Sequence, residues 1–310
     1  MSAGRRVELV KLFQQEVKNY KNISIFTSDS SPFLSAACQI SKNFLKVLPV
    51  KNKKYVSNLK NLCIKNNIKV IIPTIDTELI KLSTNIGIFR ELDIKIIISD
   101  KIFIKNTIDK LKLSIFLKKI KLPVIKRYNN KNLTFPLVAK PRKGSSSKNI
   151  YILKNKDYLF KSLLNKKNII FEKYINKNYT EFSADAYYDN KGILKSLVTR
   201  KRIEVRSGEV SKSMTLKNDL YKIIVKKLFF IKGARGPINF QFFYNENNKK
   251  YFTIEINARF GGGFPLTYAS GANYVKWIID EYIFNKEIKF YDKWKNKLLM
   301  LRFDQEIFLK

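Results

Sequence analysis

The sequence predicts a mixed fold: an α/β domain built on a parallel sheet, followed by an α+β region of antiparallel strands. Residues 1–98 alternate helical patterns with short apolar segments, which is typical of a parallel sheet covered by helices. From Phe135 onward, alternating strands joined by short turns dominate. With 310 residues and a hydrophobic content of 45%, the chain is long and apolar enough for two domains with sizeable cores.

The amino-terminal region is expected to form helix and strand in turn. Helices are predicted over 5–20, over 53–66 and from Asp76, with strands over 23–27, 44–50, 69–73 and 94–98. Ligands bind at the carboxyl ends of strands in such sheets. The candidate substrate-lining residues at these ends are Thr27, Ser28, Asp29, Thr74, Asp76 and Glu78. The alternative for each is a role in capping a helix.

The chain opens on Ser2-Ala-Gly-Arg-Arg6, which is typical of a turn from a strand into a helix. No strand precedes it in the sequence. We expect either a start site further upstream or a rearranged sheet.

A basic helical segment over 99–127 is predicted to link the two regions, with Asp109 and Lys110 opening its second helix. After it, the strand 135–141 carries Lys140 and leads into the Gly- and Ser-containing loop 142–148 and a return strand over 149–153. The backbone N–H groups and hydroxyls of such a hairpin tip can close over phosphates. An ordinary turn is the alternative.

The most informative stretch is Tyr251–Pro265, a strand that ends in a glycine-rich turn. Residues two apart on a strand share a face, so Glu255 and Asn257 present two oxygen ligands side by side, followed by Arg259. Carboxylate and amide oxygens suit Mg²⁺, and a guanidinium suits a phosphoryl group. This stretch therefore predicts a magnesium and phosphate site.

Composition excludes several function classes. The sequence contains no histidine, which removes histidine-based triads, metal sites and general bases. We identify no apolar run that could span a bilayer and no leader with a cleavage site, and the two cysteines lack metal-ligand spacing. These features predict a cytoplasmic protein that does not bind membranes.

The net charge of +36, from 61 basic and 25 acidic residues, raises the alternative of a nucleic-acid partner. The lysines are spread over every segment together with many Asn and Ile residues, which is typical of an AT-rich coding sequence. We therefore do not expect nucleic acid as the partner.

Three sets of residues, taken in order, resemble the ATP-grasp superfamily over nearly the whole chain. They are Pro136–Pro141 with Gly144, then Glu172–Ile175 with Glu181, and then Gly236–Gln241 with Glu255–Arg259. The start at Ser2–Arg6 and the segment Pro73–Glu78 resemble the amino-terminal domain of single-unit members. The branch most similar is that of the ATP-binding halves of the carbamoyl-phosphate synthase large chain. Ala258 departs from the proline of many relatives, and the length of this chain excludes a complete carbamoyl-phosphate synthase.

The resemblance implies an ATP-grasp fold with a Rossmann-like domain, called pre-ATP-grasp, over 1–98, a linker over 99–127 and an ATP-grasp domain over 128–310. Within the latter it implies an ATP-lid subdomain over about 128–175 and a carboxy-terminal catalytic subdomain over about 176–310.

The resemblance also implies roles for individual residues. Lys140, aided by Lys110, would hold the phosphates of ATP, Arg259 would steady the transferring phosphoryl group, and the loop of Gly144, Ser145, Ser146 and Ser147 would close over the triphosphate. The strand of Glu172, Lys173, Tyr174 and Ile175 would meet adenine, and Glu181 would bind ribose. Glu255 and Asn257 would coordinate Mg²⁺, or Mn²⁺ in its place, with Gln241 contributing to the same site.

The expected activity is that of an ATP-dependent carboxylate–amine ligase, which activates a small-molecule carboxylate as an acyl phosphate and joins it to an amine. Arg202, Arg206 and Arg259 are candidates to hold the carboxylate or the developing charge, and Glu209 and Ser211 lie near the same expected cleft. A nucleotide-binding module without ligase activity is the alternative from a different class. A homodimer is left open.

Overall fold

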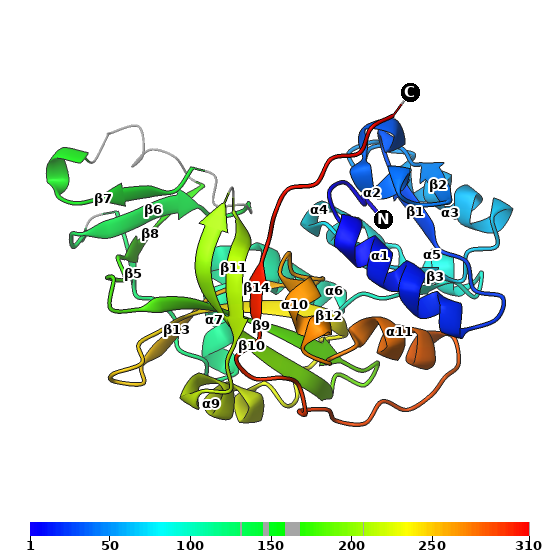
Figure 1. Ribbon diagram of the computed structural model, residues 1–310. Coiled ribbons are helices and arrows are strands. Elements are labelled where there is room, and N and C mark those ends of the chain that lie inside the picture. The colour runs from blue at the N-terminus through cyan, green and yellow to red at the C-terminus, as the bar shows by residue number, and fades with distance from the viewer. Residues whose placement is uncertain (131, 145–148, 159–167, 207, 310) are drawn as a thin grey trace.

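The computed structural model describes residues 1–130, 132–144, 149–158, 168–206 and 208–309. A large twisted sheet occupies the centre of the molecule, a small sheet lies on its left in Figure 1, and the amino-terminal strands and helices lie on its right. The expected combination of a parallel-sheet region and an antiparallel region is confirmed. Among the described residues, no helix has the length and apolar character needed to cross a membrane.

Two pairs of parallel strands, surrounded by helices, form the amino-terminal region (Figure 1). The elements are α1 (Val7–Glu16), η1 (Val17–Asn19), β1 (Phe26–Asp29), η2 (Pro32–Leu34), α2 (Ala36–Gln39), β2 (Asn43–Lys46), α3 (Tyr55–Lys65), β3 (Val70–Ile71), α4 (Asp76–Thr84), α5 (Ile86–Arg90) and β4 (Lys95–Ile96). Strand β1 pairs with β2, and β3 pairs with β4. All four strands are shorter than the sequence predicts.

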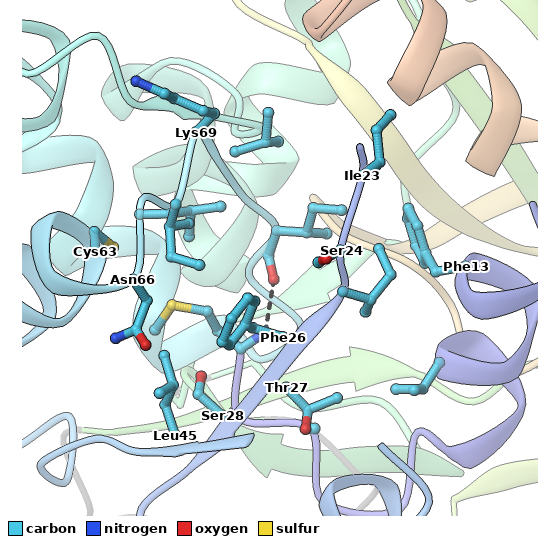
Figure 2. A pocket seen from close by; sticks show the side chains of 18 of the residues that line it. Phe13, Ile23, Ser24, Phe26, Thr27, Ser28, Leu45, Cys63, Asn66 and Lys69 are labelled. Carbon is cyan, nitrogen blue, oxygen red and sulfur yellow. Dashed lines mark hydrogen bonds between the residues drawn. The ribbon is translucent and has the colours of Figure 1, made fainter. Parts of the chain in front are cut away.

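The two strand pairs do not join within the described part of the chain, and a cavity of about 570 Å³ separates β1 from β3. Figure 2 shows side chains of Phe26, on β1, and of Lys69, next to β3, on opposite sides of this cavity. The Met1 nitrogen donates a hydrogen bond to the Ile72 carbonyl (2.9 Å), and the Ala3 nitrogen donates to the Ser28 carbonyl (3.0 Å). The first strand that a continuous sheet would need is not among the described residues, and the sheet is divided into two pairs.

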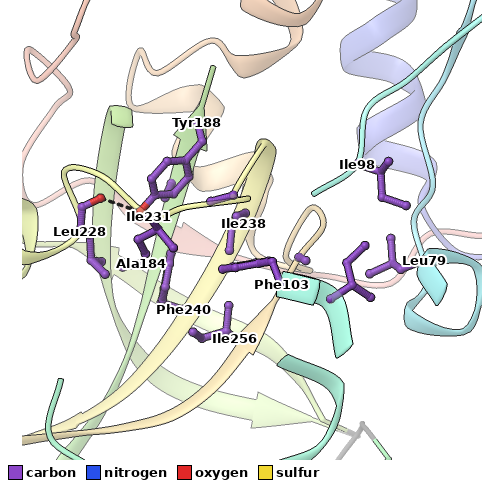
Figure 3. Close-up of a cluster of buried hydrophobic side chains, with 14 of the residues drawn as sticks. Leu79, Ile98, Phe103, Ala184, Tyr188, Leu228, Ile231, Ile238, Phe240 and Ile256 are labelled. Carbon is purple, nitrogen blue, oxygen red and sulfur yellow. Dashed lines mark hydrogen bonds between the residues drawn. The ribbon is translucent and has the colours of Figure 1, made fainter. Parts of the chain in front are cut away.

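Two helices, α6 (Lys101–Ile108) and α7 (Lys110–Lys119), connect this region to the rest of the chain and pack against β13. Phe103 on α6 is buried and lies between Leu79 and Ile98 on one side and Ile238 and Phe240 on the other (Figure 3). The segment expected to be a linker thus contributes to the main hydrophobic core. Its expected boundaries, 99–127, and those of the domains on either side stay predictions.

A small antiparallel sheet follows, in the order β5-β8-β6-β7. Its elements are β5 (Arg127–Tyr128), β6 (Leu137–Pro141), β7 (Tyr151–Leu153), the 3₁₀ turn η3 (Lys156–Tyr158) and β8 (Ile169–Lys173). The predicted hairpin is present, because β6 pairs with β7 in antiparallel register. The side chain of Lys140, on β6, forms an ion pair with Glu172 on the neighbouring strand β8.

The large sheet is antiparallel and has the order β13-β12-β9-β10-β11-β14. Its strands are β9 (Thr180–Tyr188), β10 (Leu194–Arg206), β11 (Glu209–Thr215), β12 (Gly236–Tyr244), β13 (Tyr251–Asn257) and β14 (Leu299–Leu301), and its helices are α9 (Asp219–Lys227), α10 (Phe264–Ala269) and α11 (Tyr274–Tyr282). The sequence did not indicate β14 or α10. Strand β14 brings the carboxyl-terminal tail across the sheet, and the tail continues toward the amino-terminal region (Figure 1).

The two faces of this sheet differ in polarity because side chains alternate along each strand. Phe182 and Ala184 on β9 are buried in the core beside Phe240 on β12. The intervening residues, such as Asp185 on β9 and Asn239 on β12, are directly paired in the register and are polar. The apolar face packs under the helices, and the polar face is left to form a site.

Candidate functional site

A cavity of about 440 Å³ lies where the polar face of the large sheet meets the amino-terminal region. It is lined by the amino-terminal loop 2–6, the loop 74–77 that opens α4, the strands β10, β12 and β13, and the turn 261–263. Glu255, Asn257, Arg259, Arg202 and Gln241 all line it. All five are residues that the sequence predicts for the site, and the fold brings them together in this cavity.

The oxygen ligands expected for a metal come from two paired strands. Gln241 on β12 lies directly opposite Glu255 on β13, and Asn239 lies opposite Asn257. Partners directly opposite in an antiparallel pair share a face, so their side chains are neighbours. A carboxylate and three amides share this face and can give the few oxygen ligands with which Mg²⁺ is held beside nucleotide phosphates. Within the described residues, no cluster of three or more Asp, Glu, His or Cys offers an all-protein metal site instead.

Glu255 lies in a charged environment that the sequence does not show. Burial raises the pKa of this carboxyl above its usual 4.5, and Asp76 adds to the rise. Lys110, Arg259 and Lys140 lower it in part. A partly buried carboxylate with nearby cations and no direct ion pair among the described residues is suited to gain a bound cation.

Lys140 lies on β6 of the small sheet and Lys110 is the first residue of α7, and neither of them lines the cavity. The Lys140 ammonium lies 2.6 Å from Glu172 Oε2, with both side chains nearly buried, and Arg127 Nε lies 3.1 Å from the other oxygen of Glu172. Lys110 Nζ donates to the carbonyl of Gly144, at 3.0 Å. Burial lowers the pKa of Lys110, and Glu255 partly offsets this. The two lysines expected at the phosphates are therefore both within electrostatic reach of Glu255.

Arg259 reaches out of the large sheet to the amino-terminal region. Its Nε and Nη2 donate to the two oxygens of Asp76 at 2.9 and 2.8 Å, and Nη2 also lies 3.3 Å from Asn257 Oδ1. Asp76 is the first residue of α4 and was one of several candidates at the strand ends. The ion pair places it in the same site as Arg259.

The structure pairs two other predicted site residues with each other. Arg202 Nε on β10 lies 3.2 Å from Glu181 Oε2 on β9. Glu209 lines the cavity and accepts a hydrogen bond from Arg302 at 2.9 Å. Arg206 is half exposed and pairs with Asp304, and Ser211 bonds to Glu204, so neither of them lines the cavity.

Of the remaining nucleotide residues named from the resemblance, the structure describes those at and after the end of β8. Lys173 is exposed, Tyr174 and Ile175 are half-buried, and the Tyr174 nitrogen lies 3.4 Å from the Pro136 carbonyl. Ser145, Ser146 and Ser147 lie outside the described residues. The roles of all six, and those of the residues above, stay predictions.

Most of the amino-terminal candidates serve the local structure. Asp29 accepts hydrogen bonds from the nitrogens of Gly4 and Ser31, at 3.1 Å each. Glu78 is fully buried and accepts from the hydroxyls of Ser2 and Tyr55. The others divide between the cavities: Thr27 and Ser28 line the gap between the strand pairs, and Thr74 lines both that gap and the site. Of this set, only Thr74 and Asp76 line the site.

Sequence reasoning missed a buried polar network beneath the site. Asp185 accepts hydrogen bonds from Arg200 (2.8 and 3.1 Å), Thr267 (2.5 Å) and Asn239 (2.6 Å). The glycine turn packs directly on it, because a Cβ on Gly263 would lie 2.2 Å from Arg200 Nη1. The run of glycines was the only signal in the sequence.

It also missed Arg6, the last residue before α1. Arg6 lines the cavity, and within the described part of the chain its guanidinium forms no hydrogen bond or ion pair. Its pKa is lowered to about 10, first because of its partial burial and second because of nearby Arg259.

Comparisons with known proteins agree with this architecture. Residues 1–97 match the PylC-like, N-terminal domain, and residues 166–299 match a family described as ATP-grasp in the biosynthetic pathway with Ter operon. The chain therefore has an ATP-grasp fold, with an ATP-grasp family match over residues 166–299. The finer resemblance to carbamoyl-phosphate synthase stays a prediction. A search of curated proteins found no match.

Solved structures of ATP-grasp proteins share the fold at low sequence identity. Biotin carboxylase from Campylobacter jejuni, solved with an ATP analogue, matches with a TM-score of 0.70 and 15% identity over 90% of this chain and 69% of its own. The biotin carboxylase domain of 2-oxoglutarate carboxylase from Hydrogenobacter thermophilus, solved with MgADP and bicarbonate, gives 0.73 and 15% over 96% and 72%. N5-carboxyaminoimidazole synthetase from Staphylococcus aureus, solved with ADP, gives 0.68 and 17% over 89% and 74%.

Proposed function

We propose that this ATP-grasp protein is an ATP- and Mg²⁺-dependent ligase that activates a small-molecule carboxylate as an acyl phosphate and joins it to an amine. The observation that carries the proposal is the grouping of Glu255, Asn257 and Gln241 on one polar face, with Lys110 and Lys140 within electrostatic reach of Glu255. The ADP and MgADP present in similar folds support the same assignment.

The residues present suit phosphoryl transfer without a histidine. This chemistry depends on charge neutralisation and in-line positioning more than on proton transfer. In this proposal Glu255 and Asn257 hold Mg²⁺, or Mn²⁺ in its place, with Gln241 beside them, and Lys140 and Lys110 bind phosphate oxygens. A bound Mg²⁺–ATP supplies the phosphoryl group and neutralises its charge. Arg202 and Arg259 orient the acid, each already held in place by a carboxylate partner, Glu181 or Asp76.

The cellular location and the oligomeric state of the protein also belong to the proposal. The two cysteines, Cys38 and Cys63, are buried and free, which is typical of a reducing compartment and supports a cytoplasmic location. A homodimer stays a prediction.

Hydroxylamine trapping tests the proposal. The purified protein is incubated with ATP, Mg²⁺ and a panel of amino acids and other carboxylic acids, and ADP release and hydroxamate formation are both measured. ADP release that depends on an acid, together with its hydroxamate, is the expected result, because hydroxylamine captures an acyl phosphate in place of the amine. Nucleotide binding without acid-dependent ADP release for any acid contradicts the proposal and favours a binding module without ligase activity.

A further inference from the structure

A partly buried arginine of the cavity has no partner in the described structure that neutralises it. Three arginines that line the cavity each have a carboxylate partner, Arg200 with Asp185, Arg202 with Glu181 and Arg259 with Asp76, and Arg302, which does not line it, pairs with Glu209. Arg5 also lines the cavity but is exposed to solvent. Arg6 remains, partly removed from water and without an ion pair among the described residues. A guanidinium in this state gains most from an anion that enters the cavity.

The position of Arg6 is fixed by the backbone around it. Its nitrogen bonds to the Ala3 carbonyl (2.8 Å), and its carbonyl accepts from the Val10 nitrogen (3.1 Å) as α1 begins. Gly4 just before it, with φ of +48°, is held by its nitrogen on Asp29 and by its carbonyl, which accepts from the Ser35 hydroxyl and the Ala37 nitrogen. The loop therefore presents the Arg6 side chain from a preorganised support, which reduces the entropy cost of binding.

Arg6 and Glu255 line the same cavity from different elements, Arg6 from the loop before α1 and Glu255 from β13. Glu255 is a proposed metal ligand, whereas Arg6 has no ion pair among the described residues. A carboxylate that reacts beside Glu255 would therefore leave Arg6 free for a second group of the same molecule.

We propose that the acid substrate carries a second carboxylate and that Arg6 binds it, as a specificity-determining residue. The planar fork of arginine donates two parallel hydrogen bonds to a carboxylate, which selects a diacid over a monoacid. A site built around such a group discriminates against the analogue that lacks it, because the partly buried cation is then left unpaired. This inference rests on the proposed ligase function and adds to it the class of the acid, a dicarboxylic acid with or without an amino group.

Binding measurements in the presence of Mg²⁺ and the non-hydrolysable analogue AMP-PNP test the assignment. Titration calorimetry compares succinate, glutarate, adipate and glutamate with their monoamides on the wild-type chain, on Arg6→Gln and on Arg6→Lys. We expect at least one diacid to bind 10-fold or more tightly than its monoamide, Arg6→Gln to remove that difference, and Arg6→Lys to keep part of it. Arg90→Gln, which removes the same charge from an exposed position on α5, should leave it unchanged.

The outcomes separate this inference from the proposed function. If AMP-PNP binds but diacids and monoamides bind equally, or if Arg6→Gln binds diacids as the wild type does, the role of Arg6 is wrong while the ligase proposal stands. Tight Arg6-dependent binding of 3-phosphonopropionate without binding of any diacid overturns the carboxylate assignment. If AMP-PNP does not bind to the wild-type chain, the proposed function itself fails. Unchanged AMP-PNP binding by Arg6→Gln shows that this variant has folded.

Discussion

Arg259, at the end of β13, and Asp76, at the start of α4, form a two-bond ion pair that joins the large sheet to the amino-terminal region across 183 positions of the sequence. Only 14% of the Arg259 side chain and 25% of the Asp76 side chain are exposed to solvent. The pair lies in the wall of the candidate site, so the same contact holds the two regions together and orients a proposed catalytic arginine.

Asp76→Asn should destabilise the protein by about 1–3 kcal/mol, because it leaves a largely buried guanidinium without its counter-charge. Asp100→Asn is the matched control: Asp100 pairs with Arg235, but both side chains are more exposed, at 45% and 38%. The control should cost about 0–1 kcal/mol. Urea unfolding of the wild type and the two variants measures the difference. An equal loss of unfolding free energy in both variants would show that the Asp76–Arg259 pair stabilises the protein no more than the exposed pair does.

Glu255→Gln should stabilise the free protein while it abolishes turnover. The folded pKa of Glu255 is raised above 4.5, so between 4.5 and that higher value the unfolded chain ionises while the folded one does not. Stability is therefore lost as pH rises through this window, and Gln avoids that loss. Thermal unfolding in EDTA should give a higher midpoint for the variant at pH 7 than for the wild type.

Added Mg²⁺ and AMP-PNP should reverse this order, because only the wild type retains the carboxylate that binds the metal. The difference between the two proteins in EDTA should vanish at a pH well below 4.5, where Glu255 is protonated in both states. A variant that is less stable than the wild type in EDTA at pH 7 would contradict the proposed cost of the buried charge.

Lys140→Gln should raise the Kd for ATP by about 10- to 100-fold, since a charged hydrogen bond to phosphate is lost. The Kd for adenosine, which has no phosphate, should change by less than about threefold. Lys226→Gln, an exposed change of the same charge on α9, is the control and should alter neither value. A parallel loss of adenosine binding would indicate that Lys140, bonded to Glu172, supports the fold and not the phosphates.

Gly263→Ala should destabilise the protein by about 1–3 kcal/mol, because the new methyl group would overlap Arg200 and Val210 at 2.2 and 2.9 Å. Gly87→Ala is the control: it lies in α5, and nothing stands within 4 Å of its Cβ position. Alanine there should stabilise the protein by about 0.4–1 kcal/mol. Thermal unfolding should give a lower midpoint for Gly263→Ala and a higher midpoint for Gly87→Ala than for the wild type. An unchanged midpoint for Gly263→Ala would mean that the turn can move away from Arg200.

The sequence predicted best the parts of the site that depend on one strand. Glu255 and Asn257 share a face because side chains alternate with a period of two, and the structure places both in the cavity. The hairpin around Lys140 and the strand of Gln241 could be predicted for the same reason, since their patterns are local.

Contacts between strands could not be predicted, because the sequence does not fix the register. Lys140 with Glu172, and Arg202 with Glu181, were each expected singly as ligand-binding residues, and the structure shows them as partners. Arg6 was missed for a related reason. Its importance lies in the absence of a partner among the described residues, which only the packing of distant segments reveals.

The gap between β1 and β3 has a consequence for how rigidity is distributed. Each amino-terminal strand pairs with another strand on one side only, whereas β9, β10, β11 and β12 in the large sheet pair with a strand on both sides. Amide protons of the amino-terminal strands should therefore exchange with solvent well before those of the large sheet. Glu255 lies on β13, an edge strand that pairs with the two-sided strand β12 of the large sheet, whereas Arg6 and Asp76 lie in the region that is expected to exchange faster. In the proposed function, the more rigid large sheet would therefore hold the nucleotide, and the more flexible amino-terminal region would contact the acid.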